Sequence, residues 1–283
     1  MEVCVMDEEL YDNIINLLHY SDIRLRTTEI RPVVSEGKTF IHTIIIAESI
    51  QDTIIPLKKT PAIVCLLVFS LFDAYIENKY QLETGLSFKK KYNTLTSDSY
   101  QKIIEKECYR LMKTLRNCFV HNHDKIETEN NVLKFHYINK NTQFNLNIST
   151  AKLELLYTIV SMLVTGEHEI KTNGHYKHIL CTYYKELWDH ICKHGDFTDD
   201  IGGTIAQVAT FVELNTRVRY NFKNPQYHIV KDNKIIISPI NLAEAVDYNI
   251  LYKGKTYLIP QEILDAQHSI STNDLEIWEI ISG

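Results

Sequence analysis

The chain has 283 residues, of which 45% are hydrophobic and 23% charged, a composition that suits a soluble globular protein of one large or two average domains. Its formal net charge of −6 excludes non-specific wrapping of nucleic acid, so any contact with RNA must come from a local basic patch. The six cysteines form no C-x-x-C pair, which indicates reduced core residues rather than a disulfide framework.

The sequence also argues against a membrane protein. Residues 1–9 are acidic, unlike a secretory leader, and the apolar run over residues 62–72 is too short to cross a bilayer. We therefore expect a cytoplasmic protein without membrane association.

The first third of the chain gives one ambiguous region between two helices. Residues 8–20 have a helical pattern, and Thr60-Pro61 is a suitable N-cap and first-turn pair for a long apolar helix to about Tyr80. Between them, residues 23–26 alternate like a strand and residues 35–38 resemble a turn. Residues 40–55 are β-branched but also compatible with a helix.

A second long helix is predicted from Ser97 or Ser99 to His121, because this stretch lacks Gly and Pro and has apolar residues at helical spacing. The apolar positions are Ile104, Cys108, Leu111, Leu115, Cys118 and Phe119. The opposite arc carries Lys102, Lys106, Arg110, Lys113, Asn117 and His121. We predict that Lys102, Lys106, Arg110 and Lys113 bind RNA, together with His123. The alternative is the solvated face of an ordinary surface helix.

This helix ends in the hexapeptide Arg116-Asn117-Cys118-Phe119-Val120-His121. Arg116 and His121 flank the polar face and Asn117 lies between them, so all three side chains could reach one phosphate. A guanidinium fork matches phosphate, and an imidazole can transfer protons near neutral pH. We predict that Arg116, Asn117 and His121 are catalytic residues for metal-free phosphodiester cleavage. The alternative is that His121 is only a favourable cation near a helix C-terminus.

After the hexapeptide, residues 132–137 and 143–148 form a predicted hairpin, followed by helices from residue 149 or 150 to about 165 and from 173 or 174 to 194. From Gly195 the character changes to short strands. The predicted pairs are residues 227–230 with 234–238 and residues 249–252 with 256–259.

Metal and nucleotide sites have weaker signals. His190 and His194 have the i,i+4 spacing that can chelate zinc, but two side chains on one helix do not complete a tetrahedral site. Gly254-Lys255-Thr256 lacks the first glycine of a phosphate-binding loop. We therefore predict no metal and no cofactor, with a zinc enzyme as a third alternative.

The hexapeptide and its surroundings resemble the HEPN superfamily, whose ribonucleases carry Arg, a polar residue and His near the end of a helical bundle. The match lies at Arg116, Asn117 and His121, supported by the apolar helix of residues 63–77 and the short segment 88–92. The resemblance covers roughly residues 57–165. It implies a mainly α fold, with a HEPN-like antiparallel helical bundle and an inserted β-hairpin in residues 1–195. Residues 196–283 lie outside the resemblance, and their short predicted strands indicate a small C-terminal α+β region for recognition or partner binding.

The resemblance also implies a function. Such proteins are mostly metal-independent endoribonucleases or RNA-binding modules in bacterial toxin–antitoxin, abortive-infection and anti-phage systems. We expect RNA as the substrate, a homodimer through the motif-bearing helix, and an antitoxin or phage-derived regulator as a possible partner. Asp73 or Glu77 could orient Arg116 or His121, although a solvated pair is an equal alternative. The competing function is a non-catalytic module that binds RNA or an antitoxin.

Overall fold

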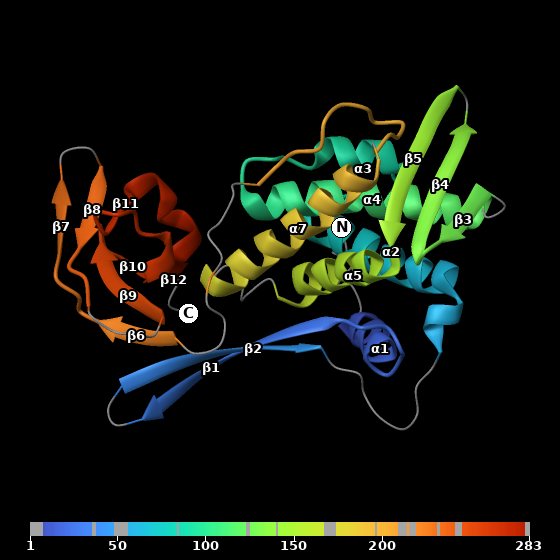
Figure 1. Cartoon of the computed structure of the whole chain (residues 1–283). Helices are drawn as coiled ribbons and strands as arrows, with labels where there is room; N and C mark the ends of the chain where they lie inside the picture. Colours follow the sequence, from blue (N-terminus) through green and yellow to red (C-terminus); the bar gives the residue numbers. More distant parts are fainter. Residues whose placement is uncertain are drawn as a thin grey trace. The chain divides into compact units, whose positions relative to one another are not determined.

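The computed structural model describes residues 8–35, 38–47, 56–83, 85–122, 125–139, 141–166, 174–195, 197–208, 214, 219–230, 233–240 and 245–280. The chain forms two compact units, each assembled from separate stretches of sequence (Figure 1). The first unit comprises residues 1–25, 47–165 and 183–208. The second comprises residues 26–46, 166–182 and 209–283. The described residues combine helices with small sheets, so the fold class is mixed α+β.

The first unit is mainly helical and carries one small sheet. Its helices are α1 (Glu8–His19), α2 (Pro61–Lys79), α3 (Phe88–Thr94), α4 (Tyr100–His121), α5 (Thr150–Thr165) and the C-terminal half of α7 (Gly174–His194). Its strands are β3 (Ile126–Glu129), β4 (Val132–Asn139) and β5 (Thr142–Ser149). Apart from α3, which the sequence did not predict as a helix, the positions of these helices and of the β4–β5 hairpin follow the sequence prediction closely.

Three helices, α2, α4 and α5, pack pairwise to make the core of the first unit. Side chains such as Val64, Leu111 and Ile159 are completely buried, and full burial of such a side chain typically stabilises the fold by about 1.5–3 kcal/mol. Helix α2 is predominantly apolar, which suits a position inside a bundle.

Helix α2 also bears on the membrane prediction. Among the described residues it alone is long and apolar enough to span a bilayer by length and composition, because the helix continues beyond residue 72 to Lys79. The core helix of a soluble protein meets the same criterion, and α2 is packed against α4 and α5.

The predicted hairpin is a regular antiparallel pair. Strands β4 and β5 pair from Val132 opposite Ser149 to Asn139 opposite Thr142. Asn141 has a φ of 65°, a left-handed conformation that asparagine tolerates in tight turns. Alternate side chains, including Phe135 and Leu146, are buried, while their neighbours face outwards. Strand β3 adds a third strand that the sequence did not predict.

The second unit contains two sheets and the N-terminal half of α7. Its strands are β1 (Arg26–Ser35), β2 (Lys38–Ala47), β6 (Arg219–Lys223), β7 (Tyr227–Val230), β8 (Lys234–Ile237), β9 (Ala245–Tyr252), β10 (Lys255–Pro260), β11 (Ser269–Ser271) and β12 (Glu279–Ile280). The larger sheet has the order β1-β2-β6-β9-β10-β12, and the smaller one the order β11-β8-β7. Both predicted C-terminal hairpins, β7–β8 and β9–β10, are antiparallel pairs.

The expected single boundary near residue 195 and the mainly α class do not describe this second unit. Strand β2 pairs with β6, with Thr39 opposite Asn221 and Ile41 opposite Arg219, so the N-terminal hairpin completes a sheet of C-terminal strands. Strands β6 and β9 are parallel, which likewise joins distant parts of the chain. The ambiguous residues 40–55 form a strand as far as Ala47, and residues 48–55 lie outside the described ranges.

Candidate functional site

The polar side chains of the predicted motif meet on the last turns of α4. Nη1 of Arg116 donates a hydrogen bond to Oδ1 of Asn117 at 3.1 Å and lies 3.3 Å from Nε2 of His121. Arg116 and Asn117 are partly exposed, and His121 is exposed. These three residues therefore form one accessible group, called here the motif cluster.

Buried neighbours hold this end of the helix in place. Cys118 and Phe119, between the polar residues, are buried, and the Phe119 ring packs edge-to-face on Phe135 with the ring centroids 5.4 Å apart. The helix ends at His121, and the backbone N–H of Asn122 bonds to the Cys118 carbonyl at 2.9 Å. The alternation of polar and apolar residues thus fixes the last turn and leaves the motif cluster outside.

The contact between Arg116 and His121 has a direct chemical consequence. A guanidinium group only donates hydrogen bonds, so this contact is a hydrogen bond when Nε2 of His121 is the unprotonated ring nitrogen. A phosphate that accepted the Nη1 N–H directed at His121 would free the Nε2 lone pair. The imidazole could then accept a proton from a nearby hydroxyl group.

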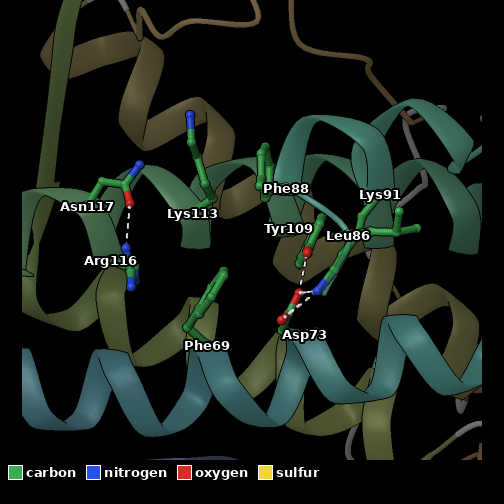
Figure 2. Close-up of a pocket in the computed structure, with 9 residues that line it drawn as sticks. All are labelled: Phe69, Asp73, Leu86, Phe88, Lys91, Tyr109, Lys113, Arg116 and Asn117. Atoms are coloured by element: carbon green, nitrogen blue, oxygen red, sulfur yellow. Dashed lines mark hydrogen bonds and ion pairs between the residues drawn. The ribbon is translucent and has the colours of Figure 1, made fainter. Parts of the chain in front are cut away.

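A pocket of ≈ 220 Å³ opens beside the motif cluster and is called here the side pocket. Arg116 and Asn117 line one end, while Asp73 and Lys91 line the other, as Figure 2 shows. The aromatic side chains between the two ends come from three different helices: Phe69 from α2, Phe88 from α3 and Tyr109 from α4.

Asp73 and Glu77 do not contact the motif cluster as predicted; they bind Lys91 instead. Nζ of Lys91 lies 2.8 Å from each carboxylate oxygen of Asp73 and 2.6 Å from Oε1 of Glu77. Burial by itself lowers the pKa of Lys91, but the hydrogen bonds that its ammonium group donates to the two carboxylates outweigh burial and raise the pKa above its usual value. Asp73 and Glu77 bind Lys91 because its ammonium group is buried and needs compensating negative charge.

Tyr109 completes this charged end of the pocket. Its hydroxyl group donates a short hydrogen bond to Oδ1 of Asp73. Burial, reinforced by the Asp73 carboxylate, raises the pKa of the Tyr109 hydroxyl well above its usual value. Tyr109 therefore stays protonated and acts as a fixed donor to Asp73.

The predicted RNA-binding face is wrong at Arg110, which is buried. Its Nε and Nη2 atoms each lie 2.7 Å from a different carboxylate oxygen of Asp199. Nη2 also bonds to the Gly202 carbonyl at 3.0 Å, and the guanidinium lies over the Phe197 ring. A loop distant in sequence thus covers this part of α4. The Arg110 guanidinium is therefore not accessible to an RNA phosphate.

The other cations of this face are also engaged within the protein. Lys113 is largely buried and pairs with Asp200, and it lines the side pocket instead of lying on an exposed face. Lys106 is partly exposed and donates to the Leu95 carbonyl at 2.7 Å, and Lys102 pairs with Asp98. Lys102 and Lys106 remain predicted RNA contacts, and His123 lies outside the described residues.

The histidine pair of α7 has a different environment from a metal site. The rings of His190 and His194 lie 4.3 Å apart, and Nε2 of His190 accepts a hydrogen bond from the backbone N–H of Ser149 at 3.2 Å. Burial, with His194 nearby, lowers the pKa of His190. Within the described ranges, no group of three or more His, Cys, Asp or Glu side chains is arranged to hold a metal ion.

The side pocket was not predicted from the sequence. Phe69 lies in a run of apolar residues that is typical of a core helix, and Tyr109 lies next to the apolar face of α4. No fixed spacing relates residues of α2, α3 and α4, so only the packing of the three helices brings them together. The one available signal was the basic segment 88–92, which contains Phe88 and Lys91.

Comparison with known proteins provides no further assignment: no protein-family model, no curated protein and no solved structure matches the chain. The motif cluster and the side pocket beside it are the candidate functional site of this protein.

Proposed function

We propose that this protein is a metal-independent endoribonuclease of the HEPN type, with Arg116, Asn117 and His121 as its catalytic residues. The observation that carries the proposal is the motif cluster itself, in which a guanidinium, an amide and an imidazole meet within hydrogen-bonding distance on an accessible helix end. A metal-free cleavage of RNA needs these functions because RNA supplies its own nucleophile, the 2′-hydroxyl.

The proposed step is a transesterification at one phosphate. Nε2 of His121 accepts the proton of the 2′-hydroxyl, the 2′-oxygen bonds to phosphorus, and the bond from phosphorus to the 5′-oxygen breaks. Arg116 binds the phosphate and stabilises the charge that develops on it, while Asn117 positions Arg116. The products are a 2′,3′-cyclic phosphate and a 5′-hydroxyl end, once the 5′-oxygen receives a proton.

That last proton has to come from a second acid, because one imidazole does not hold both roles at once. A second copy of the chain would supply it across a shared cleft, so we expect a homodimer formed through α4. Val120, the neighbour of His121, is a large hydrophobic side chain that is 41% exposed, and a second α4 could cover it. Light scattering of the purified protein measures whether it is a homodimer.

The biological role follows from the proposed chemistry. An RNA-cleaving enzyme without a cofactor suits a bacterial toxin or an anti-phage effector in the cytoplasm, held in check by an antitoxin or released by a phage-derived regulator. Growth of bacteria that express the parent chain or its variants tests this role.

The decisive experiment compares RNA cleavage in the presence of EDTA by the parent, His121→Ala and Arg116→Ala proteins. Each variant should lose about 10²–10⁴-fold in rate, the usual contribution of a general base or a charge-stabilising group. The matched control is His136→Ala, which removes an exposed histidine from β4 of the same unit and should cleave like the parent. End mapping should find cyclic phosphates.

The same experiment separates the alternative function. A non-catalytic module would bind RNA or an antitoxin equally well before and after His121→Ala, and no new RNA ends would appear. Equal cleavage rates for the parent and a folded His121→Ala protein would overturn the proposed mechanism.

A further inference from the structure

Three aromatic side chains line the side pocket and form a surface on which a flat ring can stack. Phe69 and Phe88 are partly exposed, whereas the Tyr109 ring, which packs on both, is fully buried. The Phe69 and Tyr109 rings are nearly parallel, with an interplanar angle of 7°, and the Phe88 ring lies 4.8 Å from the Tyr109 ring. Partly exposed aromatic side chains are the usual surface on which unpaired nucleobases stack.

The size of the side pocket limits what it can take. Its volume of ≈ 220 Å³ lies below the roughly 300–1,000 Å³ of most small-molecule sites. A single ring system fits this space better than a complete nucleotide does. The phosphate and sugar of a bound nucleotide would therefore lie outside, at the end formed by Arg116 and Asn117 (Figure 2).

The charged end of the pocket can accept a hydrogen bond but has no donor to spare. An ammonium group has three N–H donors, and Lys91 makes three contacts, two with Asp73 and one with Glu77. The Tyr109 hydroxyl is also used on Asp73. The Asp73 carboxylate offers about four acceptor positions, three of which are occupied, and its side chain is 27% exposed.

We propose that the side pocket binds the base of a nucleotide adjoining the cleaved phosphate and prefers bases with an exocyclic amine. Adenine, cytosine and guanine each present an amine that can donate to Asp73. Uracil presents one N–H between two carbonyl groups, whereas Lys91 is fully used on Asp73 and Glu77 and the other lysine of the pocket, Lys113, is paired with Asp200. The position of the base relative to the cleaved bond rests on the proposed function, whereas binding and selectivity rest on the pocket alone.

Titration of the full-length protein with the four nucleoside 3′-monophosphates tests the pocket, because these probes contain no bond to cleave. Uridine monophosphate should bind about tenfold more weakly than the other three, the value of one hydrogen bond to a charged group. Asp73→Asn replaces an acceptor by a donor and should reduce this preference to about twofold or less. The matched control is Glu77→Gln, which changes the other partner of Lys91 outside the pocket and should keep the preference.

Two further variants keep the test decisive if Asp73→Asn does not fold. Phe88→Ala removes a partly exposed ring and should weaken all four nucleotides about tenfold, the usual contribution of one stacked base. Arg116→Ala should weaken nucleotides but not the corresponding nucleosides, because only the former carry a phosphate.

The outcomes separate this inference from the proposed function. Equal binding of all four nucleotides, or binding that Phe88→Ala does not change, overturns the base pocket even if His121→Ala abolishes cleavage. Selective binding by a parent protein that leaves RNA intact supports the pocket and refutes the nuclease. Absence of binding up to millimolar nucleotide also overturns the pocket.

Discussion

Two arginines of α4 have opposite roles because of what surrounds them. Arg116 is partly exposed and hydrogen-bonds with its motif neighbours, while Arg110 is buried in a two-pronged pair with Asp199. Asp199 also accepts hydrogen bonds from the backbone N–H groups of Ile201 and Gly202, at 3.1 and 3.0 Å. The pair thus joins α4 to a loop that has no regular secondary structure, and its function is structural.

We predict that Arg110→Met lowers the free energy of unfolding by about 3–5 kcal/mol, because it leaves the Asp199 carboxylate buried without its partner. Urea unfolding followed by circular dichroism measures this loss. Lys102→Ala, which removes a solvent-exposed pair on the same helix, is the control and should unfold like the parent. The double variant Arg110→Met, Asp199→Leu should regain stability. Equal unfolding midpoints for Arg110→Met and Lys102→Ala would contradict the structural role of Arg110.

At the residue scale, the sequence indicated the motif cluster but not the roles of the surrounding charges. Arg116, Asn117 and His121 could be placed together because a helix fixes their separation. Whether a lysine or arginine is free or paired depends on partners far along the chain, such as Asp199 for Arg110 and Asp73 for Lys91. A charge pattern on one helix contains no information about those partners.

At the scale of elements, local patterns identify helices and hairpins, and long-range pairing does not follow from them. The apolar positions predicted for α4 are all buried, and Ser99 is its N-cap, with its Oγ accepting from the backbone N–H of Lys102. The opposite face of α4 is buried as well, at Glu107 and Arg110, because loop residues 197–203 cover it. The pairing of β2 with β6 has no local signature in either strand.

The first residue of α7, Gly174, lies close against the backbone of residues 277 and 278. A Cβ atom on Gly174 would lie 2.9 Å from the carbonyl oxygen of Ile277 and 3.0 Å from Cα of Trp278, both backbone atoms that cannot move easily. Alanine normally stabilises a helix relative to glycine by up to about 1 kcal/mol. Overpacking costs about 1–3 kcal/mol, so we expect Gly174→Ala to destabilise the second unit.

Thermal unfolding followed by Trp278 fluorescence in a Trp188→Phe background measures the Gly174→Ala effect where the strain is located. Cys192→Ala changes an exposed position of the same helix and should leave the midpoint unchanged. A midpoint for Gly174→Ala at or above that of the parent would show that the segment of residues 276–278 yields to the extra methyl group.

At the scale of the whole molecule, each unit has a buried ionic centre of its own. In the second unit, Arg219 is fully buried and bonds to Asp247 at 2.9 Å and to both carboxylate oxygens of Glu262 at 2.6 Å. Burial alone raises the pKa of Asp247, but His175 and Arg219 outweigh it and lower that pKa below its usual value. His178, on the next turn of α7, stacks on Trp278 with the ring centroids 5.7 Å apart.

This second centre predicts a loss of stability in mild acid. Burial, followed by the neighbouring His175 and Arg219, lowers the pKa of His178 from 6.5 to about 4. The unfolded chain therefore binds a proton at this residue below about pH 6.5, whereas the folded chain binds it only near pH 4. The free energy of unfolding should fall by about 2–3 kcal/mol as the pH decreases through this interval.

Urea unfolding at about pH 7 and about pH 5, followed by Trp278 fluorescence in a Trp188→Phe background, measures this dependence in the second unit. His178→Phe keeps a ring against Trp278 and should flatten the pH dependence. The control His228→Gln replaces an exposed histidine of the same unit and should retain it. A parent protein with equal stability at both pH values would show that His178 is not buried in its neutral form.

The division of both units among separate stretches of chain governs how the protein can be made and cut. During synthesis on the ribosome, strands β1 and β2 emerge early, but β6, the neighbour of β2, emerges only after the entire helical unit. The edge of β2 is then open to pairing with other nascent chains. No single protease cut or truncation can release either unit intact, so each domain would have to be studied in the uninterrupted polypeptide or after circular permutation.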